Sequence, residues 1–174
     1  MRPKSRIRPA STARVRRSSC AWGFTLVELL TTLSVLAVVA ALTAPAMRSF
    51  AAGQQVKALA YDMTGDLLLA RSEALKRNVS VSLTASGTNW ASGWTVAAGV
   101  ENIGTRNAAN ESLSFSATPS VPSVITFDIN GRVSAPSSQV RLTISSSAAP
   151  GDNAKRCIQL DLSGRARSLV GACA

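Results

Sequence analysis

The hydrophobic positions along the chain first form a long apolar run and then a helical stripe. Nineteen residues without a charge lie between Glu28 and Arg48, about the length that crosses a bilayer as a helix. Apolar residues then recur at steps of three and four, which predicts a helix with one buried face. These residues are Val56, Leu59, Ala60, Met63, Leu67, Ala70 and Ala74. Together the two patterns predict one helix over residues 24–77, apolar all round at first and one-faced afterwards.

Beyond residue 78 the period changes to that of strands. Val79, Val81 and Leu83 alternate with serines, as in a half-buried strand. Asn130-Gly131 is a favoured type I′ pair between two strands. The predicted fold class is therefore α+β, with a long N-terminal helix packed on an antiparallel sheet. Turn residues separate the other β-like runs, which are residues 93–97, 112–116, 124–128, 140–144 and 157–162.

The basic charge of the chain is concentrated at its N-terminus. Seven of the 19 Lys and Arg residues lie in residues 1–23, which contain no acid. The remaining 12 Lys and Arg residues lie in residues 24–174, together with all 9 Asp and Glu residues. The formal net charge of +10 therefore describes this leader more than the folded body. A basic leader before an apolar run is most often a targeting segment, and binding to nucleic acid or acidic lipid is the alternative. The positive flank predicts a cytoplasmic leader, with the rest of the chain outside.

The composition excludes most familiar catalytic chemistry. The chain has no His, which removes His-dependent catalysis and His-ligated zinc, and its three Cys are too few for a four-thiolate site. Asp62 and Asp66 share a helix face, but without a third ligand they are expected to be solvated. Asp128, Asp152 and Asp161 are scattered, without the pairing that acid–base hydrolysis needs. We therefore predict no enzymatic activity, no catalytic residue, no metal site and no cofactor.

One carboxylate, Glu28, stands near the cytoplasmic end of the apolar run. Placing it in hydrocarbon would cost roughly 2.5–3.5 kcal/mol, so it needs a partner or a purpose unless it lies at the membrane interface. The run also differs from an ordinary cleaved secretory signal, which is shorter and is followed by a loop rather than by a helix. The residues around Glu28 therefore decide how the N-terminal segment is interpreted.

The segment Gly23-Phe24-Thr25-Leu26-Val27-Glu28-Leu29-Leu30 resembles the processing site of type IV pilins and type II secretion pseudopilins. In that family a membrane prepilin peptidase cuts after the glycine, here Gly23, and N-methylates the new first residue, here Phe24. Glu28 then stands fifth, where the family carries its glutamate, and Pro45 stands twenty-second, where many members have a helix-bending proline. The resemblance implies that Glu28 neutralises the N-terminal amine of a neighbouring subunit and so guides assembly with other pilins.

The same resemblance divides the chain into four segments. Residues 1–23 are the leader that the peptidase removes, and residues 24–47 are the transmembrane and assembly half of the helix. Residues 48–77 are its amphipathic half, and residues 78–174 form an antiparallel, β-rich head. The implied location is the inner membrane, crossed once with the head in the periplasm, and afterwards a pilus or a periplasmic pseudopilus.

Further motifs resemble one branch, the GspH/FimT family of minor pilins and pseudopilins. Trp90 and Trp94 belong to these motifs and are expected to pack in the core rather than to stack on a base or a sugar. The motifs are Arg71-Ser72-Glu73-Ala74-Leu75-Lys76-Arg77-Asn78-Val79, Trp90, Gly93-Trp94 and Phe127-Asp128-Ile129-Asn130-Gly131.

The C-terminal part of the head combines two cysteines with a basic stretch. Cys157 and Cys173 follow the leader, and an extracytoplasmic domain is expected to join such a pair in a disulfide. Between them lies Gly164-Arg165-Ala166-Arg167, in which the glycine suits a tight turn and the arginines alternate toward one face. Lys155 and Arg156 precede it and complete the densest basic stretch after the leader.

Two interpretations of this stretch remain open. An ordinary charged hairpin on a soluble surface needs no ligand. Gly164-Arg165-Ala166-Arg167, however, resembles the Gly-Arg-x-Arg motif by which FimT-type minor pilins bind DNA during natural transformation. The resemblance implies that Arg165 and Arg167 hold the DNA phosphate backbone, with Gly164 in the turn and Lys155 and Arg156 as auxiliary charge. The alternative is a GspH-like minor pseudopilin with a structural role at the tip of a type II secretion pseudopilus and no DNA binding.

Overall fold

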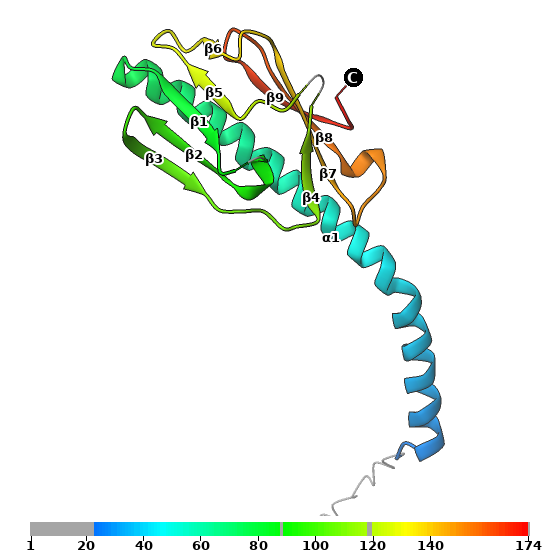
Figure 1. Ribbon diagram of the computed structural model, residues 1–174. Coiled ribbons are helices and arrows are strands. Elements are labelled where there is room, and N and C mark those ends of the chain that lie inside the picture. Colours follow the sequence, from blue (N-terminus) through cyan, green and yellow to red (C-terminus); the bar gives the residue numbers. More distant parts are fainter. Residues whose placement is uncertain (1–22, 88, 118–119, 174) are drawn as a thin grey trace, which may run out of the picture. The chain divides into compact units, whose positions relative to one another are not determined.

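The computed structural model describes residues 23–87, 89–117 and 120–173. The protein has two compact units, residues 1–39 and 40–174, and each is described by itself. Helix α1 (Leu26–Arg77) contributes residues to both units (Figure 1). The predicted helix over residues 24–77 is therefore confirmed, with its start two residues later than expected and its end at the expected residue.

In the N-terminal unit, α1 begins at a capping residue. The side-chain oxygen of Thr25 accepts a hydrogen bond from the backbone N–H of Glu28 at 3.2 Å. The hydroxyls of Thr31 and Ser34 donate to the carbonyls of Glu28 and Leu30, so these polar groups are satisfied inside the helix. By length and composition, α1 is the one helix of the described residues that is apolar enough to cross a membrane.

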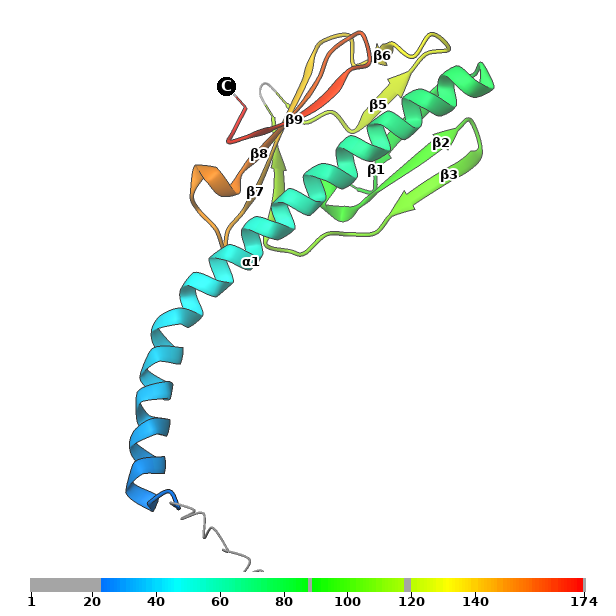
Figure 2. The ribbon, with the colours of Figure 1, turned by 180° about the vertical axis from the view of Figure 1, so that it is seen from behind.

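In the second unit, α1 buries one stripe of small and medium-sized side chains. All seven residues of the predicted stripe are buried, together with Ala52. Steps of three and four residues place them on one side of the helix, where they join a single core with strand residues. Figure 2 shows this part of α1 lying across the strands of the head.

The described residues contain nine strands, which form two antiparallel sheets rather than the single sheet expected from the sequence. The first sheet has the strand order β3-β2-β1-β5-β6, and the second sheet has the order β4-β7-β8-β9. The α+β class, with a long helix packed on antiparallel strands, is confirmed. The strands are β1 (Val81–Ala85), β2 (Trp94–Ala98), β3 (Glu101–Arg106), β4 (Leu113–Ser116), β5 (Val124–Phe127), β6 (Val133–Ala135), β7 (Val140–Ser146), β8 (Arg156–Leu160) and β9 (Ala166–Val170).

Three strands, β3, β6 and β9, are absent from the runs predicted by the strand period, although the turns expected at Asn130-Gly131 and Gly164 imply a strand after each. All three lie at the edge of their sheet. None of the residues of β3 or β9 is fully buried, and β6 has only three residues. An edge strand that covers little of the core does not need alternating apolar residues, so the period used to predict strands is missing there. The six strands that cover more of the core overlap the predicted segments.

Two tryptophans of the head are fully buried, which confirms the predicted packing role. The indole N–H of Trp90 donates to a backbone carbonyl at 2.7 Å, and that of Trp94 donates to Asp66 Oδ2 at 2.8 Å. Asp66 also accepts a hydrogen bond from Arg106 Nη2 at 3.2 Å, and Arg106 Nη1 lies 3.7 Å from Asp62 Oδ1. The sequence favours solvated carboxylates over a metal site here. Asp62 is half exposed, but Asp66 is largely buried and holds an arginine of β3 beside a buried indole, so for Asp66 the expectation of a solvated group is wrong.

Candidate nucleic-acid interface

The hairpin between β8 and β9 carries the sequence Gly164-Arg165-Ala166-Arg167. In its turn, the N–H of Gly164 donates to the carbonyl of Asp161 at 2.8 Å, and the N–H of Asp161 donates to the carbonyl of Arg165 at 3.1 Å. Gly164 has a φ of +78°, a conformation that residues with a β-carbon rarely adopt. Gly164 therefore forms the tight turn that the sequence predicts, and its N–H is already used within that turn.

A similar turn joins β5 and β6. The N–H of Gly131 donates to the carbonyl of Asp128 at 2.9 Å, and Gly131 has a φ of +69°. The predicted type I′ turn is wrong, because that turn also needs a positive φ at Asn130. Among the described non-glycine residues, Asn78 alone has a positive φ, so Asn130 does not meet this requirement. Instead, the carboxylate of Asp128 accepts hydrogen bonds from the N–H groups of Asn130 and Arg132, at 2.8 and 2.9 Å.

The two turns meet at their glycines. A β-carbon on Gly164 would lie 2.0 Å from the carbonyl oxygen of Gly131, so a larger residue would have to displace backbone. The same carbonyl accepts a hydrogen bond from Arg71 Nε of α1 at 3.1 Å. The N–H of Val133 donates to the carbonyl of Leu162 at 3.0 Å. The tip of the β8–β9 hairpin is therefore fixed to the first sheet and to the helix.

The side chains of Arg165 and Arg167 are exposed, whereas Ala166 between them packs against the core. This alternation places both arginines on the outer face, the face of the second sheet that points away from the core. Arg167 Nη2 lies 3.4 Å from Asp161 Oδ2, and the other oxygen of Asp161 accepts from Gln139 Nε2 at 2.6 Å. A carboxylate thus lies next to one of the two candidate phosphate ligands.

The structure does not bring Arg156 to the two hairpin arginines. Along β8, Arg156 alternates in step with Ile158 and Leu160, which are buried in the core. It lines a pocket with Lys57 and Gly53 of α1, on the opposite side of the second sheet from Arg167. The expectation that Arg156 adds charge to the same site is therefore corrected.

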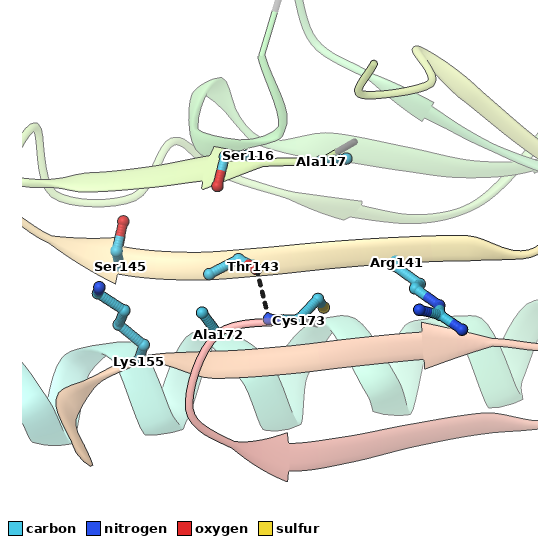
Figure 3. Close-up of a pocket in the computed structure, with 8 residues that line it drawn as sticks. All are labelled: Ser116, Ala117, Arg141, Thr143, Ser145, Lys155, Ala172 and Cys173. Carbon is cyan, nitrogen blue, oxygen red and sulfur yellow. Dashed lines mark hydrogen bonds between the residues drawn. The ribbon is translucent and has the colours of Figure 1, made fainter. Parts of the chain in front are cut away.

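Lys155, the residue before it, lies on the outer face. Its Nζ is 2.8 Å from Asp152 Oδ1, and this hydrogen bond holds the pKa of Asp152 below its ordinary value. Lys155 and Arg141 line a surface groove of about 540 Å³, here called the outer groove (Figure 3). The other residues of the outer groove are Ser116, Ala117, Thr143, Ser145, Ala172 and Cys173.

The predicted disulfide between Cys157 and Cys173 is present, with the two α-carbons 4.9 Å apart. The backbone N–H of Cys173 also donates to Thr143 Oγ1 at 3.0 Å (Figure 3). Because Cys157 is in β8 and Thr143 is in β7, these two contacts fasten the C-terminal segment onto the outer face.

Arg141 is a cation of this face that the sequence prediction missed. In the register of the second sheet it lies opposite Gln159, which in turn lies opposite Arg167. Arg141, Gln159 and Arg167 therefore form one row across β7, β8 and β9. Arg141 Nη2 donates to Gln139 Oε1 at 3.2 Å. The alternation within 140–144 reveals that Arg141 points outward, but the sequence alone does not reveal which strands are its neighbours.

The predicted processing and assembly residues lie at the start of α1. Gly23 and Phe24 precede the helix, and the side chain of Phe24 is 80% exposed. Glu28 is in the first turn and is also exposed. The rest of the predicted leader, residues 1–22, lies outside the described residues. Within the part of the chain that the structure describes, no group of three His, Cys, Asp or Glu residues could hold a metal ion.

Comparison with known proteins identifies the family. Residues 59–164 match the family model described as type II transport protein GspH. The chain belongs to the GspH family. The match in this GspH-family protein runs from the buried stripe of α1 to the glycine of the β8–β9 turn. Among curated proteins, none matches the sequence significantly.

Solved structures show the same fold. The type IV minor pilin FimU of Pseudomonas aeruginosa strain PAO1 is 20% identical, with a TM-score of 0.56 over 66% of this chain and 87% of that one. The minor pseudopilin EpsH of the Vibrio cholerae type 2 secretion system is 16% identical, with a TM-score of 0.52 over 67% of this chain and 97% of that one. The GspH-family protein thus shares the fold of a minor pilin and a minor pseudopilin, and its N-terminal helix is long and apolar enough to cross a membrane.

Proposed function

We propose that this protein is a minor type IV pilin that binds extracellular double-stranded DNA for uptake in natural transformation. The observation that carries the proposal is the pair of exposed guanidiniums of Arg165 and Arg167 on a hairpin fixed by the contact between Gly164 and Gly131. A cation on a rigid hairpin loses less conformational freedom on binding than one on a loose loop.

The chemistry of the two arginines suits a phosphate backbone. Each guanidinium is planar and offers paired N–H donors that match two phosphate oxygens. Arg167 is now held by Asp161, so a phosphate has to compete with that carboxylate or share the arginine with it. Two such contacts give weak, salt-sensitive binding without sequence preference, because backbone contacts read no base.

The proposal includes maturation of the N-terminus. A prepilin peptidase cuts after Gly23 and methylates Phe24, which are exposed residues immediately before the helix. Before assembly, α1 anchors the chain in the inner membrane with the leader in the cytoplasm and the head in the periplasm. Glu28, exposed in the first turn, then pairs with the N-terminal amine of a neighbouring pilin as the subunit enters the filament.

A gel-shift titration of linear duplex DNA with the full-length protein in neutral detergent tests DNA binding. The double variant Arg165→Ala/Arg167→Ala is expected to bind more weakly, with a salt dependence reduced by about 1.8 in the slope of log K against log salt. The control Lys57→Ala/Lys76→Ala removes the same charge from α1 and should bind like the wild type. All variants keep the seven cations of residues 1–23, so the contribution of the leader is common to all. Equal binding by wild type and the Arg165→Ala/Arg167→Ala variant would refute this function.

A structural minor pseudopilin of a type II secretion system is the second candidate. The ion pair between Arg167 and Asp161 favours it, because it gives one hairpin arginine a role within the head that needs no ligand. In that case the hairpin contacts other pseudopilins, and removing its arginines changes secretion. DNA binding by the wild type and by the variant would then be equally weak and due only to the cations of the leader. The same titration separates the two functions.

A further inference from the structure

The outer groove lies on the same face as the β8–β9 hairpin but is not part of it. We propose that the outer groove is a second binding site for the phosphodiester backbone of the same DNA, with Arg141 and Lys155 as its charged residues. This inference rests on the proposed function, because it takes the hairpin arginines as the first contact. It adds to that function a second DNA-binding site, a role for Arg141 and a dependence of DNA binding on the disulfide.

The shape of the groove follows from β7. Arg141, Thr143 and Ser145 alternate along this strand and face outward, and Lys155 lies at the Ser145 end (Figure 3). Four residues of strand span about 14 Å. Successive phosphates of one B-DNA strand advance about 3.4 Å along the helix axis, so about 14 Å corresponds to about four such steps measured along that axis. Ser116 of β4 lies opposite Thr143 and lines the groove as well.

The residues that line the outer groove suit the phosphodiester backbone of DNA better than its bases. A guanidinium and an ammonium offer charged donors to phosphate oxygens, and the hydroxyls of Ser116 and Thr143 can add neutral ones. The Ser145 hydroxyl already shares a hydrogen bond with Ser114 Oγ at 3.1 Å. None of the described residues that line this groove is aromatic, so they offer no ring for an unpaired base to stack on. The ligand class is therefore the phosphodiester backbone, recognised without reading sequence.

The row across the second sheet connects this groove to the hairpin. Arg141 and Arg167 are two strands apart, which places their α-carbons about 10 Å from each other, with Gln159 between them. One DNA backbone can therefore pass from the hairpin to the groove over the side chain of Gln159, a neutral amide that can donate hydrogen bonds. Two carboxylates oppose it, Asp161 beside Arg167 and Asp152 beside Lys155, which limits the affinity.

The C-terminal segment forms one wall of the groove. Ala172 and Cys173 line it, and Cys173 is held by the disulfide to Cys157 and by its N–H bond to Thr143. Breaking the disulfide releases this wall, so binding in the groove is expected to require the oxidised protein. Cys173→Ser should therefore weaken binding to DNA in the same direction as loss of a groove cation.

Fluorescence anisotropy with a labelled random duplex of about 20 base pairs, over a salt series, tests the groove in the full-length protein in detergent. Arg141→Gln and Lys155→Gln are each expected to lower the salt slope by about 0.9. Arg141→Lys should keep the wild-type slope, because it keeps the charge. Arg156→Gln, next to Lys155 but on the other face, is the matched control and should leave the slope unchanged. Thermal unfolding of each variant confirms that it is folded.

The outcomes separate this proposal from the proposed function. Loss of binding in the Arg165→Ala/Arg167→Ala variant, with wild-type slopes for Arg141→Gln and Lys155→Gln, overturns the groove and leaves the function intact. Wild-type binding by the Arg165→Ala/Arg167→Ala variant refutes the proposed function of the hairpin, and lower slopes for the two groove variants would then show that the groove binds DNA without it. Wild-type slopes in all of these variants overturn both proposals.

Discussion

The carbonyl oxygen of Gly131 lies directly against the backbone of Gly164, at a distance that leaves no room for a β-carbon. The two turns share the local sequence Asp-x-x-Gly-Arg, at residues 128–132 and 161–165, and in both the glycine has a positive φ. Arg71 donates to the Gly131 carbonyl from α1. The hairpin between β8 and β9 therefore takes its position from the first sheet and the helix as well as from its own sheet.

This contact predicts that Gly164→Ala destabilises the head. Positive φ and the collision with the Gly131 carbonyl act together, and a loss of about 2–3 kcal/mol in the free energy of unfolding is expected. Gly99→Ala is the matched control, because Gly99 has a φ of +59° but has nothing within 4 Å of its would-be β-carbon. That control should lose only about 1 kcal/mol. Chemical denaturation measures both losses, and equal values would show that the close approach is unimportant.

Arg71→Ala should loosen the arginine hairpin without unfolding the sheets. The substitution removes the hydrogen bond to the Gly131 carbonyl, and a loss of about 1–2 kcal/mol is expected for one such bond at a partly buried site. Hydrogen exchange should speed up at the amides of Gly164 and Val133, which belong to the joined turns, and much less in the paired strands β1 and β2. Unchanged exchange at these two amides would contradict the supporting role of Arg71.

Asp161→Asn should strengthen DNA binding if the hairpin arginines bind phosphate. The carboxylate now lies 3.4 Å from Arg167 Nη2 and repels an approaching phosphate, whereas the amide keeps an acceptor for Gln139. The dissociation constant should fall a few-fold, with the salt slope unchanged, because the number of phosphate contacts stays the same. Weaker binding in this variant would show instead that the carboxylate is needed to orient Arg167.

Acid should weaken the end of α1 through Glu73. A side-chain hydrogen bond from Arg77 lowers the pKa of Glu73 below its ordinary value of 4.5, and Arg77 also binds Glu101. Since the folded-state pKa lies below the unfolded one, this contact stabilises the protein above about pH 4.5 and is lost as the pH falls through the folded-state value. The difference in denaturation midpoint between wild type and Glu73→Gln should therefore be larger at about pH 6 than at about pH 3. A difference independent of pH would contradict this assignment.

The features that the sequence predicted well are those set by local period or by chemistry within a segment. The apolar steps from Val56 to Ala74 fixed the buried face of α1, because a helix repeats every 3.6 residues whatever lies opposite. The burial of Trp90 and Trp94 and the pairing of Cys157 with Cys173 followed from residue type and the expected compartment.

The features that it missed depend on which strands become neighbours. Lys155 and Arg156 look equivalent in sequence, but the register of β8 sends adjacent residues to opposite faces, so only Lys155 reaches the outer groove. Arg141 is 26 residues before Arg167 in the sequence, and only the order β7-β8-β9 places them in one row. The joining of Gly131 to Gly164 likewise brings together turns of different sheets.

Glu28→Ala should separate membrane insertion from filament assembly. The apolar run remains long enough to cross the bilayer, so the protein should still fractionate with membranes. Incorporation into filaments should be lost, because the N-terminal amine of the neighbouring subunit has no carboxylate to neutralise it. Glu111→Ala, which removes an exposed acid of the head, should assemble normally. Normal incorporation of Glu28→Ala would contradict the assembly role.

We propose that this chain is a processed filament subunit that carries its head into a pilus. Mass spectrometry of the N-terminal peptide of the protein recovered from sheared filaments tests that claim most directly. We expect a peptide that begins with N-methylated Phe24. A protein that is absent from the filament fraction and still begins at Met1 in the membrane would contradict it.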